Sequence, residues 1–295
     1  MSGLLFLYQR DRIRSVMGDS FFRRVFIWPL GICLFFSVFF LCAARQFPPS
    51  ELNRRPVLED MLRKAEILRS QSSGTGVTGS LRLYLSTGQS DFSACWKNVY
   101  GVRMGYLEGW RFEIAAYELN KLIGLNMIPP TVERKFKART GSLQLWVENA
   151  LSDEKRLSDA IPIPEDKRLL WSRHKYLTRA FDCPIANDDR TQQNILYTED
   201  WRTILIDHSR AFRSSKKYRT RLVYGRRGIK AEQLIRSLPR SFVQSIKNLN
   251  ENLLQGRLSD FLTQKEIQAV LERKTLLLME IEQMIKEEGE LAVFY

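Results

Sequence analysis

The chain has 295 residues, of which 44% are hydrophobic and 27% charged, and its 46 Lys and Arg against 33 Asp and Glu give a formal net charge of +13. This length is enough for one two-lobed domain with a hydrophobic core, and the positive charge favours anionic partners. Four cysteines and two histidines, without a Cys-x-x-Cys pair or metal-ligand spacing, argue against a disulfide framework, a zinc site and a Ser-His-Asp triad. Nucleic acid is not expected as a partner, because no nucleic-acid-binding motif is present.

An uncharged segment, Val25–Ala44 (VFIWPLGICLFFSVFFLCAA), follows a basic N-terminal tail at residues 1–24. As a helix rising about 1.5 Å per residue it would span roughly 30 Å, the thickness of the apolar core of a bilayer. We therefore predict one transmembrane anchor, with a cleaved signal peptide or a buried helix as alternatives. Arg23 and Arg24 favour a cytoplasmic N-terminus, and thus a single-pass membrane protein whose folded domain is extracytoplasmic or lumenal.

Residues 45–72 are predicted to be a linker and a juxtamembrane helix. The prolines of QFPPSELNRRP favour an extended linker, and PVLEDMLRKAEILRS (Pro56–Ser70) has apolar residues at helical spacing. The following stretch, SSGTGVTGS, is typical of a loop.

Residues 73–149 are predicted to form a small β-rich lobe with one helix. LRLYLS and FSACWK, separated by TGQSD, predict a β-hairpin. WRFEIAAYELNKLIGL (Trp110–Leu125) predicts an amphipathic helix that ends near Gly124. SLQLWVE (Ser142–Glu148) predicts a further strand.

Residues 150–295 are predicted to form a larger, mostly helical lobe. The predicted helices are RLLWSRHKYLTRAFD, AEQLIRSLPRSFVQSIKNL and a long C-terminal helix from about Thr263 to Glu287. The fold class expected for the chain is therefore α+β, with a β-rich lobe before a helical one.

Polar side chains are concentrated in the segment Ile185–Phe212, IANDDRTQQNILYTEDWRTILIDHSRAF. NILY and TILID predict a hairpin with Asn194 just before its first strand and Asp207 at the end of its second. Two oxygen ligands close together suit Mg²⁺ or Mn²⁺. Asp189 lies five residues before Asn194, and a carboxylate beside such a metal clamp is the minimum equipment for phosphoryl transfer. Ordinary turn chemistry accounts for any one of these residues, but poorly for the set.

A second pair of polar residues lies in the β-rich lobe. Lys97 ends the strand FSACWK, and Glu113 follows on the first turn of the next helix. This is the strand-lysine and helix-glutamate arrangement that holds ATP phosphates in kinases. The pair alone would be a weak signal, but together with Asp189, Asn194 and Asp207, in this order, it is a strong one.

The segment FDCPIANDDRTQQNILYTEDWRTILIDHSRAF resembles the catalytic core of the atypical kinases, which include phosphoinositide kinases, HipA-type bacterial kinases and secretory-pathway kinases of the Golgi casein kinase and four-jointed type. In that group a D-R-x-x-x-N loop is followed by a strand ending in I-D, here Asp189–Asn194 and Ile206–Asp207. The run Glu113–Arg134 also resembles uncharacterised bacterial proteins with this core. The resemblance covers roughly residues 75–290 and implies a two-lobed protein-kinase-like fold.

The resemblance also implies roles for the polar residues. Asp189 would be the catalytic aspartate that orients or deprotonates the acceptor hydroxyl. Asn194 and Asp207 would bind the Mg²⁺ or Mn²⁺ that bridges the ATP phosphates. Lys97 would contact those phosphates, and Glu113 would hold Lys97.

Glu148 and Asn149 would lie at the hinge between the two lobes, which contacts adenine. Together with Lys97 and Glu113 they are the residues expected to bind ATP. Some positions depart from the pattern of the group: Thr191 stands where many relatives have His or Asn, and His208–Ser209 replaces Phe-Gly. Instead of a G-x-G-x-x-G motif, the stretch SSGTGVTGS offers only Gly74, Gly76 and Gly79 as a phosphate-covering loop, and a flexible linker remains the alternative.

The function that we predict is a membrane-anchored, ATP- and metal-dependent phosphotransferase that acts on a protein hydroxyl. The basic run Arg210–Arg227 would recruit an acidic or phosphorylated acceptor or lipid head groups, or would be only a solvated face. The alternatives are a pseudokinase scaffold, a kinase-like AMP transferase, and a lipid or sugar kinase, and the sequence does not separate them.

Overall fold

The computed structural model describes residues 49–73, 79–103, 105–230 and 235–295. These belong to the larger of two compact units into which the chain divides, Ala44–Tyr295. The predicted basic tail and the predicted anchor Val25–Ala44 lie outside the described residues. Within the described ranges, no helix is both long enough and apolar enough to cross a membrane.

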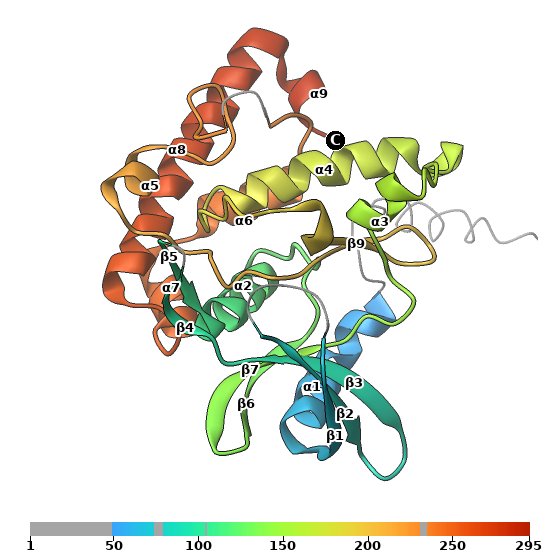
Figure 1. Cartoon of the computed structure of the whole chain (residues 1–295). Helices are drawn as coiled ribbons and strands as arrows, with labels where there is room; N and C mark the ends of the chain where they lie inside the picture. Colours follow the sequence, from blue (N-terminus) through green and yellow to red (C-terminus); the bar gives the residue numbers. More distant parts are fainter. Residues whose placement is uncertain (1–48, 74–78, 104, 231–234) are drawn as a thin grey trace, which may run out of the picture. The chain divides into compact units, whose positions relative to one another are not determined.

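An antiparallel five-stranded sheet, shown in the lower part of Figure 1, forms the first part of this unit. Its strands follow the order β1-β2-β3-β7-β6. They are β1 (Glu66–Ser72), β2 (Leu81–Ser86), β3 (Asp91–Lys97), β6 (Thr131–Phe136) and β7 (Arg139–Leu145). The predicted hairpin is confirmed, since β2 and β3 pair with Leu83 opposite Ala94. Leu83, Trp96 and Leu143 form part of a core beneath this sheet, because alternate residues of each strand point to the same face.

Helix α1 (Pro49–Lys64) covers this core and packs on β6 and β7, with Leu62 fully buried. The predicted helix Pro56–Ser70 is wrong in its last part, because Glu66–Ser72 is the edge strand β1, paired with β2. Most side chains of β1 are exposed, so no alternation of apolar and polar residues marks it as a strand. Since β1 and β2 belong to one sheet, the predicted lobe boundary at residue 73 falls between paired strands.

A second hairpin, made by β4 (Tyr100–Arg103) and β5 (Tyr106–Gly109), follows β3 and leads into helix α2 (Trp110–Leu122). The hairpin was not predicted, whereas α2 agrees with the predicted helix up to its last turn. Its apolar residues at helical spacing, such as Ala115 and Leu119, are fully buried in the larger core. This core also contains residues of the C-terminal helices, so α2 packs against both parts of the unit.

The remainder is mostly helical, with a small three-stranded sheet of order β10-β9-β8. The strands are β8 (Leu151–Ser152), β9 (Ile195–Tyr197) and β10 (Thr203–Leu205). The helices are α3 (Asp153–Ser158), α4 (Arg168–Asp182), α5 (Lys216–Thr220), α6 (Arg240–Asn248), α7 (Glu251–Leu258), α8 (Gln264–Glu288) and α9 (Glu290–Val293).

The predicted helices of this part are confirmed in α4 and α8, and the predicted hairpin in β9 and β10. Helix α8 starts at a capping box in which Thr263 and Glu266 satisfy each other's backbone N–H groups. The first four residues of the predicted helix AEQLIRSLPRSFVQSIKNL, 231–234, lie outside the described residues. Helix α6 begins only after Pro239, which occupies its N-cap in an extended conformation. The expected α+β class, with a β-rich part before a helical part, is therefore confirmed.

Candidate active site

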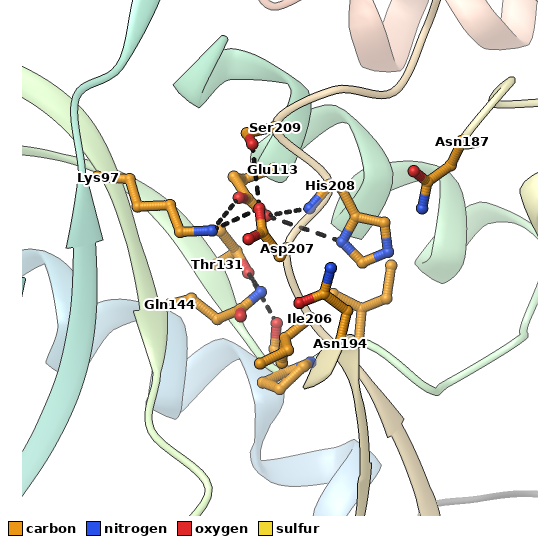
Figure 2. Close-up of polar contacts among 12 residues, drawn as sticks. Lys97, Glu113, Thr131, Gln144, Asn187, Asn194, Ile206, Asp207, His208 and Ser209 are labelled. Carbon is orange, nitrogen blue, oxygen red and sulfur yellow. Dashed lines mark hydrogen bonds and ion pairs between the residues drawn. The ribbon is translucent and has the colours of Figure 1, made fainter. Parts of the chain in front are cut away.

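The structure brings Lys97, Glu113 and Asp207 together, as Figure 2 shows. Lys97 Nζ lies 2.7 Å from Glu113 Oε1 and 2.8 Å from Asp207 Oδ1. Lys97 is 9% exposed and Glu113 is 2% exposed. A lysine at the end of a strand thus joins a carboxylate of α2 to the carboxylate that follows β10.

The surroundings of Lys97 and Glu113 keep these two side chains charged at neutral pH. Burial alone would lower the pKa of Lys97, but the carboxylates of Asp207 and Glu113 outweigh it and raise that pKa. For Glu113, burial would raise the pKa, but Lys97 and the hydrogen bond from His208 lower it well below the usual range. Lys97 is therefore a fixed cation and Glu113 a fixed anion.

A glycine in the neighbouring strand allows Lys97 to occupy this place. Lys97 pairs with Ser142 of β7, and a Cβ added to Gly141 would lie 2.2 Å from Lys97 O. No side chain fits at that distance, so β3 and β7 can approach each other here only if residue 141 is glycine.

Asp207 lies in a tight turn after β10. Its φ is 55°, a left-handed conformation that Asp and Asn adopt more readily than other non-glycine residues. Ser209 Oγ donates to Asp207 Oδ1 at 3.0 Å, and the backbone N–H of His208 donates to Glu113 Oε2 at 2.9 Å. The turn therefore fixes the Asp207 carboxylate beside Lys97.

The fully buried ring of His208 links this group to the loop that carries Asp189. Arg190 Nη2 donates to His208 Nε2 at 2.9 Å, which leaves the ring proton on Nδ1, 3.7 Å from Glu113 Oε2. Burial and the Arg190 cation lower the pKa of His208. Arg190 in turn pairs with buried Asp182, at 2.9 Å from Nη2 and 3.0 Å from Nε.

Asn194 and Asp189 lie on the same loop. Asn194 Nδ2 donates to Asp189 O at 3.4 Å, which leaves its side-chain oxygen for other partners, and Ile206 N donates to Asn194 O at 3.2 Å. Asn194 therefore lies beside the residue that precedes Asp207.

The two adjacent aspartates of this loop differ in their surroundings. The Asp189 side chain is 40% exposed, and its Oδ2 lies 3.2 Å from Arg210 Nη1. Burial raises the pKa of Asp189, and Arg210 opposes this shift. Asp188 is held by Tyr218 Oη at 2.5 Å and by Arg213 Nη2 at 2.8 Å. Only Asp189 thus combines exposure with a place on the loop of Asn194.

Glu148 and Asn149 form other contacts. Glu148 Oε1 accepts from Ser93 Oγ and from Arg82 Nη2, both at 2.6 Å. Asn149 Nδ2 donates to Glu199 Oε1 at 3.1 Å. Glu148 also lines a mostly apolar, partly open pocket of about 260 Å³, together with residues of α1, the segment after β7 and the β9–β10 hairpin. Among the described residues, no recorded polar contact joins Glu148 or Asn149 to Lys97 or Asp207.

The described residues contain no cluster of three or more His, Cys, Asp or Glu side chains that could hold a metal ion by themselves. The predicted clamp differs from such a cluster, because it consists of one carboxylate, Asp207, and one amide oxygen, that of Asn194. Mg²⁺ is commonly held by one or two carboxylates while phosphates and water fill its other positions. The donor set therefore fits a cation that arrives with a nucleotide.

Sequence reasoning missed two ion pairs of this region. Arg210 bonds the buried Glu108 of β5 as well as Asp189, and Arg190 bonds Asp182. Arg190 and Asp182 both lie in the segment that resembles the catalytic core of the atypical kinases, so their opposite charges could have indicated a pair. Nothing in the sequence around Glu108 marks it as a partner of a residue far along the chain.

Comparisons with known proteins agree with this geometry at the level of the fold. The sequence matches no family model and no curated protein. Among solved structures, hydra Fam20 with sugar is similar with a TM-score of 0.60 and 18% identity, over 85% of this chain and 95% of that chain. The Golgi casein kinase is similar with a TM-score of 0.59 and 15% identity, over 85% of this chain and 80% of that one, and its Mn/ADP-bound structure has a TM-score of 0.60. The chain therefore has an atypical protein-kinase-like fold.

Proposed function

We propose that this chain is an ATP- and metal-dependent phosphotransferase, anchored in a membrane by Val25–Ala44, which phosphorylates a protein hydroxyl. The observation that carries the proposal is the double contact of Lys97 Nζ with Glu113 and Asp207. A buried lysine shared between a helix carboxylate and a turn carboxylate is the arrangement that kinases use at the ATP phosphates.

In this proposal Glu113 keeps Lys97 in place, and Lys97 meets the phosphates of ATP. Asp207 and the side-chain oxygen of Asn194 hold the divalent metal, whose charge neutralises the phosphate oxygens when it is bound. The Golgi casein kinase, which shares the fold, is known with Mn/ADP bound, and this supports the choice of nucleotide and metal.

Asp189 is the residue that we assign to the acceptor. It is half-exposed, and burial raises its pKa, so it can accept a hydrogen bond or a proton from a hydroxyl that approaches from solvent. Asp188 is less suited, because Tyr218 and Arg213 already occupy its two oxygens.

The proposal of an acidic acceptor is supported by the charges near Asp189. Arg210 and Arg213, at the start of the predicted basic run, are neutralised by carboxylates of this chain. An acidic acceptor would therefore be recruited by exposed cations further along the run, such as Lys216 and Lys217. The proposed extracytoplasmic or lumenal location rests on Arg23 and Arg24 alone.

The test uses the full chain in detergent or nanodiscs. Its thermal unfolding is followed with ATP, with and without Mg²⁺ or Mn²⁺, for the native chain and for Asp207→Asn. At about 100 times its dissociation constant, a ligand adds roughly 2.7 kcal/mol of stability. We expect a metal-dependent shift that Asp207→Asn abolishes. The matched control, Asp200→Asn, changes an exposed aspartate of the same β9–β10 hairpin and should keep the shift.

Labelled ATP then separates the reactions. Transfer of the γ-label to protein supports phosphotransfer, and transfer of the α-label indicates an AMP transferase instead. Nucleotide binding without transfer to protein, lipid or sugar acceptors indicates a pseudokinase. The absence of any shift with nucleotide and metal would contradict the ATP-dependent function.

A further inference from the structure

The β4–β5 hairpin lies between the two elements that supply the ion pair of the site. It follows Lys97 of β3, and its second strand ends at Gly109, which is the N-cap of α2. Tyr100 pairs with Gly109, and Gly101 pairs with Glu108. No linker separates β5 from α2, so the hairpin and the first turn of the helix that carries Glu113 are one continuous element.

This hairpin contacts the segment after Asp207 through the backbone and through a side chain. Gly109 N donates to Ser209 O at 2.8 Å. Glu108 Oε1 accepts from Arg210 Nε at 2.7 Å and lies 2.5 Å from Arg210 Nη2. Glu108 is 1% exposed, and its Oε2 is buried without a hydrogen-bond partner among the described residues. The hairpin thus contributes a buried anion whose ion-pair partner is Arg210.

Arg210 uses different parts of its guanidinium for two carboxylates. The edge formed by Nε and Nη2 binds Glu108, while Nη1 contacts Asp189 Oδ2 at 3.2 Å. Because a guanidinium is planar and rigid, fixing one edge on Glu108 also fixes the direction of Nη1. Without Glu108, the same edge could turn to Asp189 and bind both of its oxygens.

We propose that Glu108 and Arg210 are positioning residues for the acceptor side of this site. Glu108 fixes the guanidinium of Arg210, and Arg210 holds one oxygen of Asp189 so that the other faces the acceptor hydroxyl. This inference rests on the proposed phosphotransfer and assigns to it two residues that touch neither nucleotide nor metal. It also ties Asp189 to the element that begins the Glu113 helix.

The competing explanation is that the Glu108–Arg210 ion pair only stabilises the fold. The Arg219–Glu272 pair is an example of such a structural ion pair. Arg219, in α5, bonds both oxygens of Glu272 in α8, and neither residue has a recorded contact with the residues of the site. This pair is partly exposed. The Glu108 pair is more deeply buried, where desolvation makes a charge pair costly, and it is shared with a third charged group. Glu272, which lies outside the predicted basic run Arg210–Arg227, therefore provides a matched control for Glu108.

The experiment measures steady-state conversion of ATP to ADP, and self-labelling with γ-labelled ATP, by the full chain with Mn²⁺. For Arg210→Gln we expect kcat to fall by about tenfold or more, as for a misplaced catalytic group, while KM for ATP stays within about threefold. Glu108→Gln should lower kcat in the same way but less. Glu272→Gln should leave kcat within about twofold of the native value.

A double variant separates positioning from stability. Because Glu108 acts through Arg210, adding Glu108→Gln to Arg210→Gln should lower kcat no further. If Arg210→Gln does not fold, Arg210→Lys takes its place, since a lysine keeps the charge near Glu108 but cannot hold both carboxylates in a fixed geometry.

The outcomes distinguish this inference from the proposed function. A folded native chain that neither turns over ATP nor labels itself would contradict both. A native chain that turns over ATP, with Arg210→Gln within twofold of it, would overturn the positioning role and leave the proposed function intact. Additive losses in the double variant, or a KM that rises as kcat falls, would likewise assign the pair to structure.

Discussion

Two buried cations lie at opposite ends of one polar network, and their surroundings differ. Arg190 pairs with the buried Asp182 and donates to Ile206 O at 2.7 Å and Asn194 O at 3.2 Å, all groups of its own part of the unit. Lys97 pairs with Glu113 and with Asp207, whose side chain is 31% exposed. The ring of His208 lies between the two cations.

The surroundings of the two cations indicate different roles: Arg190 stabilises the fold, whereas the carboxylate bound by Lys97 is open to a ligand. Arg190 contacts the buried carboxylate of Asp182 and the backbone carbonyls of Asn194 and Ile206, so this end of the network holds the Asp189–Asn194 loop in one conformation. The contact of Lys97 with Asp207 includes a partly exposed carboxylate, which can exchange one cation for another. We therefore expect changes near Arg190 to affect stability, and changes near Asp207 to affect activity.

The largest expected effect is the loss of Arg190. Arg190→Met leaves Asp182 buried without its cation, and breaking a buried pair in this way costs about 3–5 kcal/mol of unfolding free energy. Urea unfolding measures this loss. Adding Asp182→Leu removes the unpaired charge and should restore part of the stability. A loss below about 1 kcal/mol in Arg190→Met would contradict the structural role.

The next effect concerns Asp207. Asp207→Asn keeps a residue that tolerates the left-handed backbone but removes the charge, so we expect turnover of ATP to fall by roughly a hundred- to a thousandfold. The unfolding free energy should change much less than in Arg190→Met, because Asp207 is partly exposed. Equal losses of stability in the two variants would remove the distinction between the two ends.

His174, a buried histidine outside the polar network, should make the free energy of unfolding depend on pH. Burial lowers the pKa of His174 from 6.5 to about 4. Between these two pKa values, the unfolded chain binds a proton at His174 that the folded chain does not. The free energy of unfolding therefore has its full value above pH 6.5 and decreases as the pH falls towards 4. The full loss is about 3 kcal/mol. His174→Gln should flatten this part of the curve of unfolding free energy against pH, and an unchanged slope would contradict the assignment.

The smallest effect is expected at Glu148. Its carboxylate binds Arg82 and Ser93 and is 58% exposed. Glu148→Gln should therefore change the unfolding free energy by less than about 1 kcal/mol and the affinity for ATP by less than about fivefold. Calorimetric titration with ATP and Mn²⁺ measures this affinity. A larger loss of affinity would support the predicted hinge role of Glu148.

The parts that the sequence predicted have local causes. Helices α4 and α8 follow from apolar residues at helical spacing, and α8 also from its capping box at Thr263. The β9–β10 hairpin follows from two short apolar runs. Motif spacing also singled out Lys97, Glu113 and Asp207, which the structure brings together. The roles assigned to Asp189 and Asn194 stay predictions.

The parts that escaped prediction depend on distant partners. Strand β1 has mostly exposed side chains and is a strand because β2 supplies its hydrogen bonds. Glu108 and Arg210 are separated by about a hundred residues along the chain, so only the folded structure reveals their pairing. Motif spacing thus identifies the polar residues of the site but not the contacts that orient them.

Gly141 has a consequence for judging whether a chain of this kind is active. Since a Cβ at this position would collide with Lys97 O, a descendant that replaced this glycine would displace the lysine strand while every polar residue of the motif remained in its sequence. Such a protein would be inactive, although its sequence would still contain every motif residue. The loss of activity in a kinase-like protein can therefore result from the replacement of a glycine, a residue that carries no side chain.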